Sequence, residues 1–154
     1  MEWFFELLTN PFLITSVSSW LIAQVLKTII FAIITKHFDW HRLFGDGGMP
    51  SGHSATVSSL ATVCALVYGP GSVIFAITAI LAIIVCHDAM GVRREAGKQA
   101  FILNEIIKAF EELSEEALPE VKLKEFVGHT PIQVAAGILI GMVNGCLMWF
   151  LLFG

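Results

Sequence analysis

Two short polar segments, each placed just before a long apolar run, hold the residues best suited to chemistry. Residues 47–54 read Gly-Gly-Met-Pro-Ser-Gly-His-Ser, and residues 128–131 read Gly-His-Thr-Pro. Each segment places a histidine next to unpaired backbone N–H groups at a predicted helix start, where the helix dipole favours an anion. One histidine can attack phosphorus while the other protonates the leaving group. The pair therefore predicts phosphoryl transfer at a membrane surface.

Phosphoryl transfer also needs positive charge and N–H donors around three equatorial oxygens. The chain offers a small set of suitable residues: Lys27, Ser51, Gly52, His53, Arg93, Arg94 and His129. Lys27 lies deep in an apolar run, where a charge is costly, so we expect it to face a polar cavity. A lysine that snorkels to the membrane surface is the alternative. Gln24 lies one turn earlier on the same helical face and can reach the same cavity.

Arg93 and Arg94 directly follow the third apolar run. Cations at this position commonly anchor a helix at the membrane interface, and we expect one of the two to do only that. Asp88 is expected to pair with an arginine in a structural role.

The elements that carry these residues are predicted to be membrane helices. Of the 154 residues, 56% are hydrophobic and 14% are charged, whereas about a quarter of the residues in a soluble domain are charged. A membrane span needs about 20 residues, and we expect spans at about 11–35, 52–68, 71–91 and 130–153. The second span is long enough only if its helix starts near the headgroups. The sequence thus predicts an all-α integral membrane four-helix bundle, forming a single domain over residues 1–154.

The loop between the third and fourth spans has a helical pattern of its own, from about residue 95 to 118. One apolar stripe recurs in steps of three and four residues, at Leu103, Ile106, Phe110, Leu113 and Ala117. Glutamates and a lysine occupy the opposite face, so we expect a cytoplasmic amphipathic helix lying on the protein or the membrane. A divalent-metal site formed by the glutamates is the alternative, but no tight ligand spacing supports it.

Positive charges are distributed unevenly over the loops. All lysines and arginines except Lys27 lie in the loops after the first and third spans. The positive-inside rule places both loops, and both histidine segments, in the cytoplasm, with both termini outside. A net charge of −4 argues against nucleic acid as a partner. We therefore expect a multi-pass protein of the plasma membrane whose site faces the cytoplasm.

The last span carries glycines four residues apart, at Gly137, Gly141 and Gly145. Such a ridge of small residues lets two helices approach closely. The partner helix is either another span of the same bundle or a second copy of the chain in a homodimer.

The segment Pro50-Ser51-Gly52-His53 resembles the P-S-G-H motif of the type 2 phosphatidic acid phosphatase superfamily, which includes the vanadium haloperoxidases. The chain is most similar to a small divergent branch, described as acid phosphatase/vanadium-dependent haloperoxidase-related. In that branch a G-G-M-P-S-x-H-S block, a G-V-R-R block and a G-H-T-P block recur in this order. Here they are residues 47–54, 91–94 and 128–131. Three ordered blocks are much more specific than one motif.

The resemblance implies a role for each matching residue. His129 would be the nucleophile that forms a phosphohistidine, and His53 the acid that protonates the leaving oxygen. The implied phosphate ligands are Lys27, Ser51, Gly52, Gly128 and either Arg93 or Arg94. The chain departs from the family at two places: no Arg-Pro follows Lys27 at the family spacing, and Gln133 replaces the aspartate that orients the histidine. A neutral amide still accepts a hydrogen bond from the His129 ring, but it stabilises the imidazolium less.

These features predict a membrane phosphatase that hydrolyses a phosphomonoester through a phosphohistidine, with no metal or cofactor. A site facing the cytoplasm fits a lipid phosphate made on the inner leaflet, such as phosphatidylglycerophosphate. Two alternatives stay open. Gln133 and the missing Arg-Pro also fit a catalytically weak or inactive scaffold that binds phosphate or lipid. Lys27 and the glycine ridge also fit a small transporter subunit, although a transporter predicts polar residues along a path through the membrane.

Overall fold

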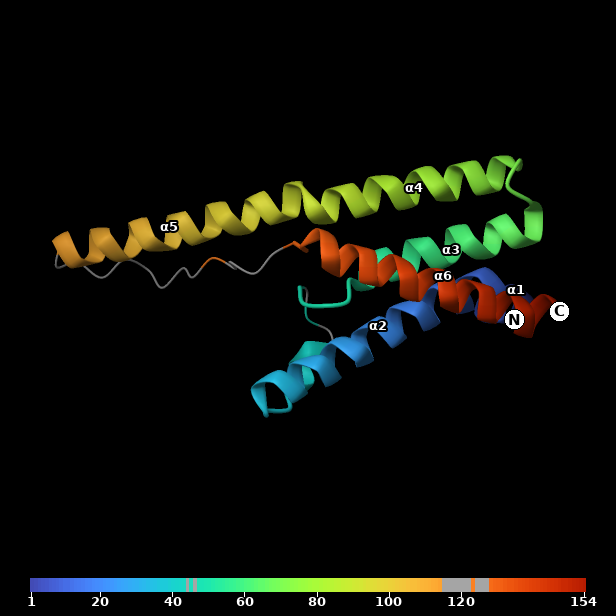
Figure 1. Cartoon of the computed structure of the whole chain (residues 1–154), viewed down its shortest axis with the longest axis horizontal. Coiled ribbons are helices and arrows are strands. Elements are labelled where there is room, and N and C mark those ends of the chain that lie inside the picture. Colours follow the sequence, from blue (N-terminus) through green and yellow to red (C-terminus); the bar gives the residue numbers. More distant parts are fainter. Residues whose placement is uncertain (44, 46, 115–122, 124–127) are drawn as a thin grey trace.

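The computed structural model describes residues 1–43, 45, 47–114, 123 and 128–154. The α-helices are α1 (Glu2–Leu8), α2 (Pro11–Thr35), α3 (Gly52–Tyr68), α4 (Val73–Met90), α5 (Val92–Ser114) and α6 (Pro131–Phe153), and a 3-10 helix, η1 (Trp40–Leu43), follows α2 (Figure 1). The described residues contain no strand, so the predicted all-α class is confirmed. Helices α2, α3, α4 and α6 begin and end within two residues of the four predicted spans.

The helix starts are fixed by side-chain caps. Asn10, Ser51, Ser72 and Thr130 each accept a hydrogen bond from a backbone N–H of the following helical turn. Two of these caps precede a proline, at Pro11 and Pro131, where the missing N–H is no loss. Capping side chains therefore set the first residue of each of the helices α2, α3, α4 and α6.

Among the described residues, three helices are long and apolar enough to cross a membrane: α2, the stretch Val73–Phe110 that starts with α4, and α6. The fourth predicted span, α3, has 17 residues and buries several hydroxyl side chains. It lies between the others and packs against α2, α4 and α6 (Figure 1). The part of the chain that the structure describes is thus all-helical, with three candidate membrane spans and the shorter α3 packed between them.

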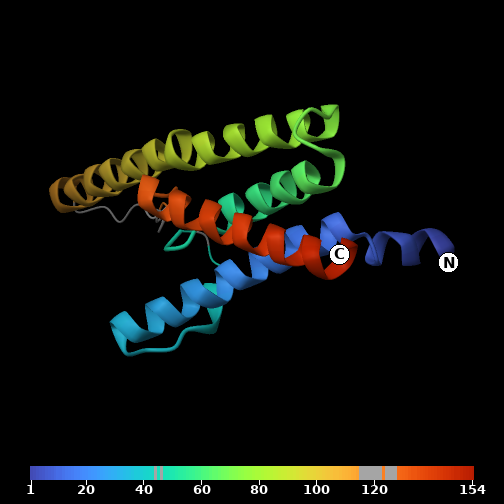
Figure 2. The same ribbon diagram turned by 45° about the vertical axis from the view of Figure 1, so that its right-hand side comes forward.

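Helix α4 continues into α5 after a single residue, Gly91, so that the two form one long rod (Figures 1 and 2). The Glu95 N–H donates to the Gly91 carbonyl at 3.0 Å, which lets α5 begin at Val92 rather than near residue 95 as predicted. On the predicted apolar stripe, Leu103, Ile106 and Phe110 are all exposed. The predicted helix end at 118 lies outside the described residues.

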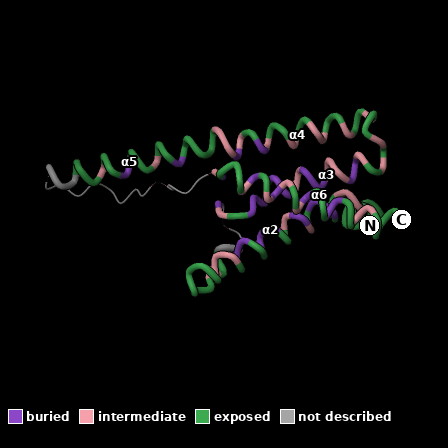
Figure 3. The backbone as a smooth tube through the Cα atoms, in the orientation of Figure 1, coloured by how far each residue is buried: buried purple, intermediate pink, exposed green. Residues whose placement is uncertain are grey.

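Burial is the reverse of that in a soluble protein (Figure 3). Large apolar side chains such as Ile77, Leu139 and Val143 are 63–69% exposed. The fully buried residues are mostly small or hydroxylated, including Ala23, Ser19 and Ser59. This pattern is expected where lipid is the solvent, because association then relies on close packing and interhelical hydrogen bonds rather than on apolar burial.

The glycine ridge of α6 packs on α3. A Cβ at Gly137, Gly141 or Gly145 would collide with α3, at Ser51, Ala55 and Thr62 respectively. At Gly145 the Cβ would lie only 2.8 Å from Thr62 Cβ. The ridge is therefore used inside the chain, as the first of the two predicted alternatives has it.

Asn144 ties the same helix to α2. Its buried amide donates to Ser19 Oγ at 2.7 Å, to Ser18 Oγ at 2.9 Å and to the Thr15 carbonyl at 3.2 Å. An amide at membrane depth is stable only when its hydrogen bonds are made within the protein. These hydrogen bonds of Asn144 therefore fix the position of α6 relative to α2.

Candidate functional site

The two histidine segments meet at one end of the helices, where α3 and α6 begin and α4 ends. Two backbone hydrogen bonds join these elements: the Ser51 N–H donates to the Gln133 carbonyl at 3.0 Å, and the His129 N–H donates to the Ala89 carbonyl at 2.9 Å. Both bonds connect parts of the chain that are far apart in sequence. The predicted approach of the two segments is thus held by the backbone itself.

Gly128 determines how the second segment passes α5. Its φ is +89°, and a Cβ at this position would lie 2.6 Å from Arg94 Cα. Only glycine combines a positive φ with such a close approach to another backbone. Because Gly128 has no side chain, the backbone can pass close to α5, and this determines the position of His129.

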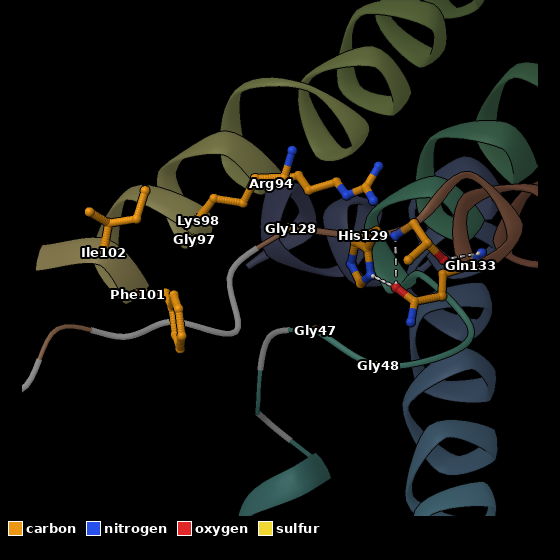
Figure 4. Close-up of a pocket in the computed structure, with 11 residues that line it drawn as sticks. Gly47, Gly48, Arg94, Gly97, Lys98, Phe101, Ile102, Gly128, His129 and Gln133 are labelled. Atoms are coloured by element: carbon orange, nitrogen blue, oxygen red, sulfur yellow. Dashed lines mark hydrogen bonds between the residues drawn. The ribbon is translucent and has the colours of Figure 1, made fainter. Parts of the chain in front are cut away.

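His129 and His53 lie near one another, with 6.4 Å between the ring centroids and 60° between the ring planes. His129 is 5% exposed. Its Nδ1 lies 3.3 Å from Gln133 Oε1 (Figure 4). Because the amide oxygen can only accept, this contact puts a proton on Nδ1 and leaves Nε2 with a lone pair. Nε2 is thus the nitrogen of this ring that is able to attack an electrophile, and the predicted contact between His129 and Gln133 is present.

The surroundings keep the His129 ring neutral. Burial lowers the pKa of His129 below its ordinary value of 6.5 because it penalises the charged form. The hydrogen bonds to Gln133 and to the Gly48 backbone act in the opposite direction, whereas the positive charges of Lys27 and His53 lower the pKa further. A neutral imidazole at neutral pH is the form that a nucleophile requires.

A small cavity of about 120 Å³ lies between the two histidines and α2. It is lined by Trp20, Gln24, Lys27, Gly45, Gly47, Gly52, His53 and His129. Lys27 is 5% exposed, and its Nζ donates to the Gly45 carbonyl at 3.3 Å. The lysine therefore faces a polar cavity, as predicted, and does not snorkel to the surface. Gly48, with a φ of +85°, lies against the stem of this side chain.

A second cavity of about 760 Å³ also has His129 in its lining. It is lined by Gly47, Gly48, Arg94, Gly97, Lys98, Phe101, Ile102, Gly128, His129, Thr130 and Gln133. Figure 4 shows Arg94 extending from the start of α5 on the side of His129 and Gln133, with Phe101 and Ile102 further along the helix. The cavity thus carries Arg94 on the side of His129 and apolar side chains further along α5, whereas the Lys98 ammonium group pairs with Glu95 at 2.6 Å.

The structure separates the two arginines. Arg93 Nε donates to Asp88 Oδ2 at 2.8 Å in an exposed ion pair, which is the structural role predicted for Asp88. Arg94 lines the large cavity. One helical step of about 100° turns adjacent residues to different faces, so the sequence alone left this choice open.

Ser51 caps the start of α3 with its hydroxyl group. It is fully buried, and its hydroxyl accepts from Ser54 Oγ at 3.0 Å and from the Ser54 N–H at 3.4 Å, as the cap of α3. It lines neither of the two cavities, whereas the next residue, Gly52, lines the small one. Arg93 likewise lines neither cavity, and the roles of Ser51 and Arg93 as phosphate ligands stay predictions.

Several lining residues were missed by sequence reasoning, namely Trp20, Gly45, Gly97, Lys98, Phe101 and Ile102. Trp20 had a visible signal, because it lies four residues before Gln24 and seven before Lys27, on one face of α2. Lys98 lies one turn after Arg94, but an exposed lysine on an amphipathic helix carries no such signal.

Comparison with known proteins gives the family of the chain. Residues 8–144 match the family described as "Divergent PAP2 family". The chain is also 43% identical over 147 residues to the "Uncharacterized membrane protein YuiD" of Bacillus subtilis (strain 168), covering 90% of this chain and 93% of that protein. No solved structure matches the chain. With the three sequence blocks meeting at one end of the helices, and a family match over nearly the whole length, the chain belongs to the Divergent PAP2 family.

Proposed function

We propose that this protein is a metal-independent membrane phosphatase that cleaves a phosphomonoester through a phosphohistidine on His129. The observation that carries the proposal is the arrangement around the small cavity, where a buried, neutral histidine faces a lysine and a second histidine. This arrangement brings a nucleophile (His129), a cation (Lys27) and an acid (His53) to the lining of one cavity large enough for a phosphate group. A passive phosphate site needs no nucleophile with an oriented ring.

In the first step, Nε2 of His129 attacks phosphorus, and the bond to the leaving oxygen breaks. His53, in its protonated form, gives its proton to that oxygen. Lys27 and the backbone N–H groups near Gly52 stabilise the charge on the equatorial oxygens, and Arg94 approaches the same group from the large cavity. Gln133 accepts from the Nδ1–H and holds the ring in the reactive tautomer.

The large cavity favours a lipid phosphate as substrate. Arg94 lies on the side of His129, and the apolar side chains Phe101 and Ile102 lie further along α5. A phosphorylated lipid has the same order of groups, with charge at the reacting end and hydrocarbon beyond it. We propose a substrate of this class, such as phosphatidylglycerophosphate.

The proposed orientation in the membrane rests on the distribution of lysines and arginines along the chain. We propose that α3 crosses the membrane as the fourth span and that both histidine segments face the cytoplasm, because the lysines and arginines outside α2 lie on the loops at that end. The amphipathic α5 then starts at the cytoplasmic surface. We place the protein in the plasma membrane.

The test is release of inorganic phosphate from a panel of lipid phosphates by the purified protein, with and without a chelator. We expect turnover with at least one lipid phosphate, no loss on chelation, and inhibition by vanadate as a mimic of the pentacoordinate state. His129→Ala should abolish release, whereas His87→Ala, which removes an exposed histidine at the same end of α4, should not. Equal activity of the two variants, or activity that returns only with magnesium, would contradict the proposal.

A further inference from the structure

The small cavity contains a buried hydrogen-bond acceptor that nothing in the described structure satisfies. Gln24 is 5% exposed, and its Oε1 has no hydrogen-bond partner. Buried carbonyl oxygens are nearly always paired, so an orphan of this kind calls for an explanation. Gln24 lines the cavity beside Lys27 and His53, and a Cβ at Gly52 would lie 4.0 Å from its Cδ. Its side chain is thus next to the segment that carries His53.

The missing partner must be a donor, and this restricts what it is. A phosphoryl dianion presents only acceptor oxygens, and so does the ester oxygen of a substrate. Lys27 and the glycine N–H groups suit those oxygens, whereas the Gln24 carbonyl repels them. Water is the reactant that brings two O–H donors to this space, and it is needed once the leaving group has departed.

On the basis of the proposed function, we propose that Gln24 positions the water that hydrolyses the phosphohistidine. One water hydrogen is donated to Gln24 Oε1, while the other is taken by His53 as the water oxygen bonds to phosphorus. The P–N bond breaks, and its electron pair returns to Nε2 of His129. The hydrogen held by Gln24 leaves on the product phosphate, so that the atoms and charges balance. Gln24 is thus a positioning residue for the second half of the reaction.

Methanol provides a sharp test, because it has one O–H where water has two. Methanol attacking the phosphohistidine gives its proton to His53 and has none left for Gln24. Gln24→Leu should therefore slow hydrolysis by about tenfold, the loss of roughly one hydrogen bond, and leave transfer to methanol nearly unchanged. The measured quantity is the ratio of methyl phosphate to inorganic phosphate at a fixed methanol concentration. This ratio does not depend on how much of the variant is folded.

The control is Thr28→Val, which removes a buried hydroxyl of the same helix that donates to the Gln24 backbone carbonyl at 2.9 Å. We expect the wild-type product ratio in the control and a ratio raised about tenfold in Gln24→Leu, with phosphohistidine accumulating in the steady state. An unchanged ratio in Gln24→Leu would overturn the role of Gln24 in placing water. Failure of the wild-type protein to form any phosphohistidine would instead show that the proposed function is wrong.

Discussion

Gln133 Oε1 lies 3.3 Å from His129 Nδ1 and at the same time accepts the Thr130 N–H at 3.0 Å. A single oxygen thus belongs both to the capping box that starts α6 and to the orientation of the proposed nucleophile. The helix start and the tautomer of the ring are consequently set by the same side chain.

Gln133→Leu should reduce the rate by on the order of a hundredfold or more, as loss of an orienting group does in hydrolase triads. Because the contact with Gln133 raises the His129 pKa, its loss should also move the acidic limb of the pH–rate profile to lower pH. Gln133→Asp should keep activity and move the limb upward. Thr130→Ala, which removes the other half of the capping box, is the control for helix stability. A fully active Gln133→Leu with an unchanged profile would remove Gln133 from the mechanism.

The pH dependence of the wild-type protein should reflect a lowered His129 pKa. The neutral ring is the reactive form, so the acidic limb of the kcat/KM profile should have its midpoint below pH 6.5, the ordinary value for histidine. Stability should change in the same direction. The unfolded chain binds a proton at His129 before the folded protein does, so stability falls as pH drops below 6.5 towards the lowered pKa. An acidic limb above pH 6.5, measured on a reactive substrate, would contradict this assignment.

The neighbouring arginines should behave differently. Arg94→Ala should lower kcat/KM by roughly tenfold to a hundredfold, because a charged donor to the substrate is lost. Arg93→Ala should remain within a few-fold of wild type, since an exposed ion pair with Asp88 contributes only about 0–1 kcal/mol. Steady-state kinetics of the two variants, side by side, decides the matter, and the reverse ranking would show that Arg93 is the substrate ligand.

Two glycines with positive φ allow the cost of backbone strain to be measured separately from the cost of a steric clash. Gly69→Ala, at φ +82° in open space, should cost about 1–3 kcal/mol from backbone strain alone. Gly128→Ala, at φ +89° against the Arg94 backbone, should cost more and should also abolish turnover, because His129 must shift. Thermal unfolding in detergent and phosphate release measure the two effects. Equal destabilisation of the two variants would mean that the close approach at Gly128 is not needed.

The proposed topology can be checked by cysteine labelling of an otherwise Cys-free chain. Positions Arg42 and Lys122 should react only from the cytoplasmic side, and residues next to both termini only from outside. Labelling of Lys122→Cys from the outer face of intact cells would reverse the orientation and with it the leaflet from which substrate comes.

The sequence predicted much of this fold because the information is local. Caps such as Ser51 and Thr130, next to long apolar runs, fix helix ends to within two residues. The contact between His129 and Gln133 was also predictable, since it spans one helical turn. The start of α5 was not predictable in this way, because a glycine such as Gly91 commonly ends a helix, whereas here it joins α4 to α5. The choice between Arg93 and Arg94 depends on the phase of that junction, which no pattern in the sequence specifies.

The close contact between α6 and α3 has a consequence for how this chain can vary. Exposed apolar residues can be exchanged for other apolar residues without changing the contacts between the helices. The identity of these residues therefore depends little on the site. Gly137 admits no such drift, since one added methyl group would push α6 away from Ser51 and from the helix that carries His53. The separation of the two histidines of the proposed site therefore depends on a position on α6 that has no side chain, and only glycine meets that requirement there.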